Sequence, residues 1–144
     1  MTAEGLLEAA GWYPGRDVGR LGAGIAELVE AGFPVDESVE RLLREYSGLA
    51  IGDEAEARYL WVDGSRAAIE ADPDWVAAYS KDLHLRLAPI GGYSHMLVMA
   101  DSAGRCWGGF DYEYGLLGES LLSTIDALLA AGPVPRLDRR LPDG

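Results

Sequence analysis

The chain has 144 residues, of which 49% are hydrophobic and 25% charged, so it suits one folded domain and argues against a disordered chain. Asp and Glu number 24 against 12 Lys and Arg, and the resulting formal net charge of −12 argues against binding to nucleic acid phosphates or anionic lipid. Such a charge attracts basic partners, although an acidic surface also serves solubility alone.

The first 48 residues have the periodicity of three helices. A short apolar stripe at residues 6–10 predicts the first. Residues 17–32 carry apolar side chains at helical spacing, begin at the candidate N-cap Asp17 and end before Pro34. Residues 36–48 predict a third helix with one apolar face. The N-terminal part of the chain is therefore expected to be helical.

After residue 48 the pattern changes to short apolar runs separated by turn residues. We expect strands at 49–51, 59–62, 85–90, 96–100 and 105–110, and helices at about 72–82 and 119–132. Residues 101–104 read as a hairpin turn. Strands joined mostly by hairpins predict an α+β fold, in which helices pack against a mainly antiparallel sheet.

One domain is expected over residues 1–132. Residues 133–144 contain three prolines and mixed charges, which predict a loose C-terminal tail. No stretch approaches the ~20 apolar residues of a membrane helix, and no apolar leader follows the start, so we expect neither a membrane segment nor a signal peptide. A single cysteine suits a reducing compartment. These features predict a cytoplasmic protein.

The glycines at 19, 22 and 24 do not have the spacing of a nucleotide-binding loop, and no strand precedes them. Close packing against a neighbouring element explains them better. The chain thus carries no sequence pattern for a phosphate-binding site.

His95 and Cys106 are the plausible nucleophile and base pair. A turn centred on 102–103 would place Met99 opposite Cys106 and separate His95 from Cys106 by four rungs, or about 13 Å. A working dyad needs roughly 3 Å. His84 and His95 also lack the i, i+4 spacing of a helical metal pair. We expect no catalytic residue, no metal site and no cofactor.

Tyrosines and carboxylates gather at two predicted strand ends. Tyr is common in protein-binding hot spots, and carboxylates pair with Arg or Lys of a partner. The candidate partner-binding residues are Asp53, Glu54, Glu56, Asp111, Tyr112, Glu113 and Tyr114. We expect them to converge on one acidic edge of the sheet. The alternative is that the acids only keep loops soluble and the aromatic residues only pack the sheet.

Residues 7–16 read Leu-Glu-Ala-Ala-Gly-Trp-Tyr-Pro-Gly-Arg and resemble the opening of the third family of the SUKH superfamily. Further segments are similar to the same family over residues 5–132: Gly48-Leu49, Ala88-Pro89-Ile90-Gly91, the hairpin at 101–107 and Leu117-Gly118-Glu119-Ser120. SUKH proteins are α+β domains.

The resemblance implies a bacterial immunity protein, which binds and neutralises a cognate polymorphic toxin that acts on nucleic acid. It implies no catalytic residues, and the binding surface varies within the family. The partner would then be a protein toxin domain with a basic surface. Two alternatives remain open: a small hydrolase or ligand-binding enzyme with a pocket assembled from distant residues, and a regulatory scaffold protein without a toxin.

Overall fold

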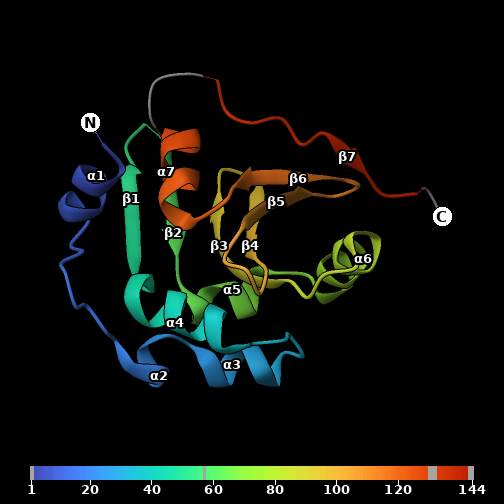
Figure 1. Ribbon diagram of the computed structural model, residues 1–144, viewed down its shortest axis with the longest axis horizontal. Coiled ribbons are helices and arrows are strands. Elements are labelled where there is room, and N and C mark those ends of the chain that lie inside the picture. The colour runs from blue at the N-terminus through green and yellow to red at the C-terminus, as the bar shows by residue number, and fades with distance from the viewer. Residues whose placement is uncertain (1, 57, 130–132, 143–144) are drawn as a thin grey trace.

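A seven-stranded antiparallel sheet, in the order β1-β2-β3-β4-β5-β6-β7, organises the fold (Figure 1). The computed structural model describes residues 2–56, 58–129 and 133–142. The strands are β1 Leu49–Asp53, β2 Arg58–Val62, β3 Ala88–Tyr93, β4 Met96–Ala100, β5 Cys106–Phe110, β6 Glu113–Gly118 and β7 Arg139–Arg140. The helices are α1 Ala3–Ala9, α2 Gly19–Gly22, α3 Ile25–Glu30, α4 Glu37–Tyr46, α5 Gly64–Glu70, α6 Pro73–Leu83 and α7 Leu121–Leu129. The predicted α+β class is confirmed.

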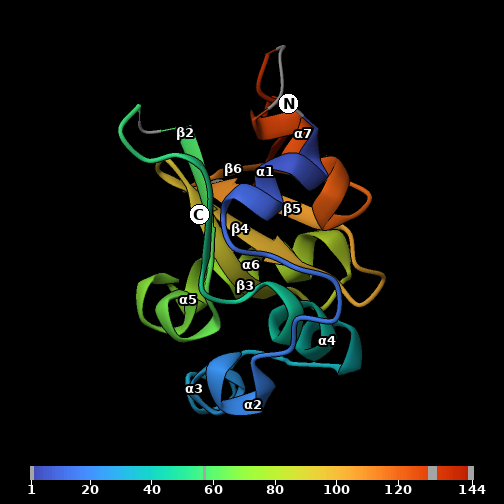
Figure 2. The ribbon, with the colours of Figure 1, turned by 90° about the vertical axis from the view of Figure 1, so that its left-hand side faces the viewer.

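The helices pack around the sheet in separate groups. Helix α7 packs against β2, β6 and α1, while α5 packs against β3 and α3. Figures 1 and 2 show α2, α3 and α4 grouped at one end of the sheet, and Figure 1 shows α6 beside the β5–β6 side. The core between the layers is apolar, and its completely buried side chains include Leu28, Leu43, Ile51, Leu60, Ile90, Val98, Ile125 and Leu128.

The segment after α1 is fastened to the end of α4. The indole of Trp12 donates a 3.0 Å hydrogen bond to Oε2 of Glu45. The Arg16 guanidinium donates to the carbonyl oxygens of Glu45 and Ser47, at 2.5 and 2.8 Å. The Arg16 side chain thus satisfies carbonyl groups that α4 leaves open at its C-terminus, while Trp12 bonds to a side chain of the same helix. The Trp-Tyr-Pro-Gly-Arg stretch therefore has a structural role.

The predicted helix over residues 17–32 was wrong in its continuity. It breaks into α2 and α3 at Gly24, whose φ of 71° lies in the left-handed region. Gly24 lies so close to α5 that a Cβ there would overlap the backbone of Ser65. The close packing expected of these glycines is therefore seen at Gly24, whereas Gly19 has open space where its Cβ would be.

The hairpin between β4 and β5 forms as predicted, but its register differs by one residue. Ala100 lies opposite Cys106, and Met99 opposite Trp107. The backbone N–H of Asp101 donates to the carbonyl of Arg105 at 3.0 Å, so three residues form the loop instead of two. The buried carboxylate of Asp101 fixes this loop, because its oxygens accept from the backbone N–H groups of Ala103 and Arg105 and from the Trp107 indole.

The C-terminal segment is attached to the sheet, contrary to the expected loose tail. Strand β7 pairs with β6, and the N–H of Leu141 donates to the carbonyl of Tyr112 at 2.8 Å. The Leu141 side chain is only 6% exposed, so burial of an apolar group holds the segment in place. The predicted end of the last helix at Gly132 lies outside the described residues. Of the helices that the structure describes, none is both long and apolar enough to cross a membrane.

Candidate partner-binding surface

One face of the sheet is only partly covered, and two glycines shape it. Trp61, Gly92, Leu97 and Gly109 lie opposite one another across β2, β3, β4 and β5, so their positions share a face. A Cβ at Gly92 would lie 2.6 Å from Nε1 of Trp61, and one at Gly109 would lie 2.5 Å from Cε2 of Tyr79. The glycines thus admit aromatic rings. We call this the open sheet face.

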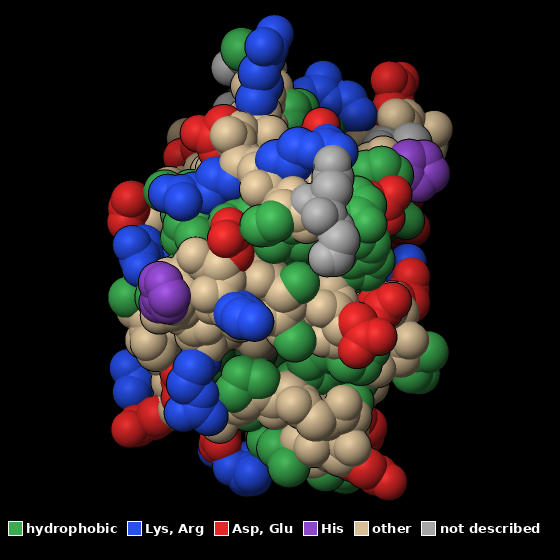
Figure 3. All heavy atoms as spheres, turned by 90° about the vertical axis from the view of Figure 1, so that its right-hand side faces the viewer, with side chains coloured by type: hydrophobic (Ala, Val, Ile, Leu, Met, Phe, Trp, Pro, Cys, Tyr) green, Lys and Arg blue, Asp and Glu red, His purple; other side chains and the backbone are tan. Residues whose placement is uncertain are grey.

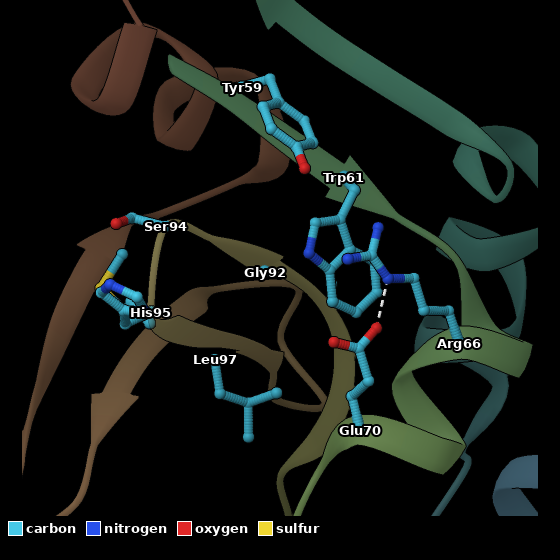
Figure 4. A pocket seen from close by; sticks show the side chains of 10 residues that line it. Tyr59, Trp61, Arg66, Glu70, Gly92, Ser94, His95 and Leu97 are labelled. Atoms are coloured by element: carbon cyan, nitrogen blue, oxygen red, sulfur yellow. Dashed lines mark hydrogen bonds and ion pairs between the residues drawn. The ribbon is translucent and has the colours of Figure 1, made fainter. Parts of the chain in front are cut away.

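The first hollow on the open sheet face, the Trp61 hollow, has a volume of about 370 Å³. Its lining includes Tyr59, Trp61, Arg66, Glu70, His95 and Leu97 (Figure 4). The Arg66 guanidinium carbon lies 4.0 Å from the Trp61 ring centroid, and the same group forms an ion pair with Glu70. This hydrogen-bonded carboxylate raises the pKa of Arg66. The chain itself therefore places a cation in this hollow.

The second hollow, the Trp75 hollow, has a volume of about 170 Å³ and adjoins the first through Glu70, His95 and Leu97. Its remaining lining is Ala71, Asp72, Trp75, Tyr79, Gly109, Phe110 and Asp111. Aromatic rings and three carboxylates surround it, and none of these described lining residues is Lys or Arg. It therefore has the chemistry of a receptor for a positive charge.

Local structure holds the Asp72 carboxylate and the backbone of Asp111. Asp72 is the N-cap of α6, and its Oδ1 accepts a 2.9 Å hydrogen bond from the N–H of Asp74. Asp111 has a φ of 54° in the β5–β6 turn, and its carbonyl accepts a 2.5 Å hydrogen bond from the Tyr79 hydroxyl. Burial raises the pKa of Tyr79, and the charges of Asp111 and Asp72 raise it further, so this hydroxyl stays a donor.

A separate groove of about 540 Å³ lies between α6 and the C-terminal segment. Trp75, Tyr112 and Leu141 form part of its apolar surface, and Lys81 and His84 also line it. Tyr112 is 40% exposed and meets Trp75 edge to face, with 5.1 Å between ring centroids. Figure 3, which views the side where α6 and β7 lie, shows Lys and Arg scattered among apolar side chains. This side of the molecule is not a uniform acidic patch.

The structure separates the two predicted acidic segments. Asp53, Glu54 and Glu56 lie at the β1–β2 turn, whereas Asp111, Tyr112 and Glu113 lie at the β5–β6 turn. Two strands lie between β2 and β5. At the usual ~4.8 Å per strand, β2 and β5 are about 14 Å apart, so the two turns are not adjacent. Figure 1 shows the two turns in different parts of the molecule.

Tyr114, one of the predicted partner-binding residues, lies inside the fold. Its side chain is completely buried, and its hydroxyl donates to Oδ2 of Asp82 on α6. Its neighbours at the turn fit the open sheet face better, because Asp111 lines the Trp75 hollow and Tyr112 lines the adjacent groove.

Sequence analysis missed Trp61, Trp75 and Glu70, which come from three different elements. The signal that was available is the glycines inside predicted strands, since such glycines often mark the close approach of another group.

The residues considered for catalysis lie apart. Cys106 is completely buried at the start of β5, and burial raises its pKa to about 11. His95 lies in the β3–β4 turn, at the far end of β4 from Cys106. Within the described residues, no group of three or more His, Cys, Asp or Glu side chains is placed to hold a metal ion.

A protein-family model described as SUKH-3 immunity protein matches residues 2–131, which include every element from α1 to α7 and exclude β7. No curated protein and no solved structure matches the chain.

Proposed function

Because the chain belongs to the SUKH-3 immunity protein family, we propose that it binds a cognate bacterial toxin domain and neutralises it without catalysing a reaction. The family match over residues 2–131 carries this proposal, since it spans almost the whole fold. An immunity protein protects the cell that makes the toxin, so we place this encounter in the bacterial cytoplasm.

The charge of the chain supports a toxin that acts on nucleic acid. Such enzymes present Lys and Arg where they bind phosphate groups. A chain with a formal net charge of −12 complements that surface and accelerates the encounter. The toxin would then be blocked because the immunity protein occupies the site of its substrate.

We propose the open sheet face as the contact surface. It is concave, and its aromatic side chains belong to the residue types that dominate protein-binding hot spots. Asp111 and Tyr112 lie at its margin. The carboxylates Asp53, Glu54 and Glu56 at the β1–β2 turn act at longer range, by attracting a basic partner.

Co-expression tests the proposal. The toxin encoded next to the gene for this chain would be expressed in a bacterium with and without the chain, and a catalytically inactive toxin would serve as the control for toxicity. We expect growth to be restored only when the chain is present. Continued killing, with folded chain present in excess, would rule out neutralisation of that toxin.

A further inference from the structure

We infer that the Trp75 hollow receives one cationic side chain, an arginine or a lysine, from the toxin. The inference rests on the proposed function for the identity of the partner. The site itself is defined by Asp72, Asp111, Trp75 and Phe110, and it can be tested without the toxin.

The lining of the Trp75 hollow suits a cation. Carboxylates of Glu70, Asp72 and Asp111 surround it, and they repel an anion. The rings of Trp75 and Tyr79 are stacked, with 6.2 Å between centroids and 18° between planes. An aromatic face attracts a positive charge, and a carboxylate pairs with it. Glu70 already pairs with Arg66, but a neutral apolar group would bring no positive charge to Asp72 and Asp111.

The Trp61 hollow shows the same chemistry with its cation in place. There a ring, a carboxylate and a guanidinium come together as Trp61, Glu70 and Arg66 (Figure 4). The Trp75 hollow repeats the ring and the carboxylates, yet its described lining has no Lys or Arg. The two hollows share Glu70. The open sheet face thus has two adjacent receptors for a cation, one occupied by the chain and one open to a partner.

The size and rigidity of the Trp75 hollow limit the occupant. Its volume of about 170 Å³ equals that of about five or six water molecules at ~30 Å³ each, which suits the end of one side chain. The N-cap hydrogen bond fixes the Asp72 carboxylate before binding, and the Tyr79 hydrogen bond fixes the backbone of Asp111. Little ordering is then needed when the cation enters, and this favours affinity.

A short peptide tests the site. Acetyl-Gly-Arg-Gly-amide and its neutral analogue acetyl-Gly-citrulline-Gly-amide would be titrated into the full chain and followed by NMR. We expect saturable shifts of the Trp75 indole N–H and the Gly109 amide with the arginine peptide only, because citrulline has the same shape without the charge. Equal shifts with both peptides, or no shift near Trp75, would overturn the inference.

Two variant chains complete the test: one loses two carboxylates of the hollow, and the control loses a carboxylate outside it. Asn caps helices and tolerates a positive φ, so Asp72→Asn and Asp111→Asn remove charge and keep the backbone. The double variant should weaken arginine-peptide binding at least fivefold. Asp74→Asn removes an exposed carboxylate of α6 that does not line the hollow, and it should bind like the wild type. If the double variant binds the peptide as tightly as Asp74→Asn does, the hollow is not the site.

Measurements of toxin binding distinguish a failure of this inference from a failure of the proposed function. A wild-type chain that forms no complex with the toxin would overturn the proposed function, while the peptide titration would still decide the hollow. A complex that forms equally well with the wild type and with the Asp72→Asn/Asp111→Asn variant would overturn the inference and leave the proposed function standing. Weaker binding by the double variant alone supports both.

Discussion

The hydroxyl of Tyr79 donates a 2.5 Å hydrogen bond to the carbonyl of Asp111, which lies 32 residues later in the chain. This bond ties the middle of α6 to the β5–β6 turn. The same Tyr79 ring lies against Gly109, so one side chain both covers the strand and holds the turn. The Trp75 hollow depends on this link, since α6 supplies Trp75 and the turn supplies Asp111.

Removing the Tyr79 hydroxyl should loosen the β5–β6 turn without leaving a cavity in the core. Tyr79→Phe should lower the free energy of unfolding by about 1 kcal/mol, because the partly buried hydrogen bond to the Asp111 carbonyl is lost. Urea denaturation measures this change. Tyr13→Phe is the control, since Tyr13 is 57% exposed and should change stability very little. Equal stability of both variants would show that the Tyr79 bond does not hold the turn.

Gly19 and Gly24 have nearly the same backbone conformation, so their Ala variants distinguish the cost of backbone strain from the cost of steric overlap. Gly19 has a φ of 75° and open space at its Cβ position, whereas Gly24 has a φ of 71° and faces the backbone of Ser65. Both Ala variants bear the cost of a left-handed conformation, about 1 kcal/mol. Gly24→Ala should cost about 2 kcal/mol more, because α3 and α5 must move apart. Similar losses in thermal or chemical unfolding would contradict the close contact.

Cys106 should be inert in the folded chain. Burial raises its pKa to about 11, so the thiol is neutral near pH 8, and the thiolate is the reactive form. We expect a thiol reagent at pH 8 to label the native chain far more slowly than the chain in guanidinium. Equal labelling rates would mean that Cys106 is accessible in the native state.

The same raised pKa predicts how stability changes with pH. The thiol has a pKa of about 8.5 in the unfolded chain and a higher pKa in the folded chain. The unfolded chain therefore loses this proton first. Its effect on the free energy of unfolding is absent below about pH 8.5, and above that pH the free energy of unfolding falls as the pH rises toward about 11. Cys106→Ala should therefore show a shallower decline of the unfolding free energy than the wild type over this range. Parallel declines would contradict the assignment.

The carboxylates of the β1–β2 turn should affect the rate of encounter with the toxin more than the lifetime of the complex. Glu54→Lys combined with Glu56→Lys reverses two charges and keeps the Asp53 side chain, which accepts a 3.0 Å hydrogen bond from the N–H of Ala55. We expect several-fold slower association with the toxin at low salt and little difference at high salt, because salt screens exposed charges. A faster dissociation rate at every salt concentration would instead place this turn inside the interface.

The sequence was sufficient for the elements with a strong local pattern. Helix α4 and the β4–β5 hairpin each carry their own periodicity and turn residues, and both form where they were predicted. Helix α5 was missed because it is a short segment that begins at Gly64, a poor helix former. The hairpin register was missed because the Asp101 carboxylate decides the length of the loop through several hydrogen bonds.

The candidate surface was harder to predict than the elements. Tyr112 and Tyr114 are two residues apart and looked equivalent, yet Tyr112 lies in a turn and Tyr114 is buried beneath Asp82 of α6. The lining of the Trp75 hollow comes from α5, α6, β4 and β5, and only the folded chain brings these elements together. Packing between residues far apart in the chain leaves no local sequence pattern, except for the strand glycines that leave room for aromatic rings.

Toxin inhibition by the purified chain tests the central claim most directly. The activity of the toxin domain on its substrate would be measured at increasing concentrations of the wild-type chain, with Trp75→Ala, checked for folding, measured in parallel. We predict that activity falls in proportion to the fraction of toxin bound, and that Trp75→Ala requires at least tenfold more protein for the same inhibition. Full toxin activity in a large excess of folded wild-type chain would contradict the account.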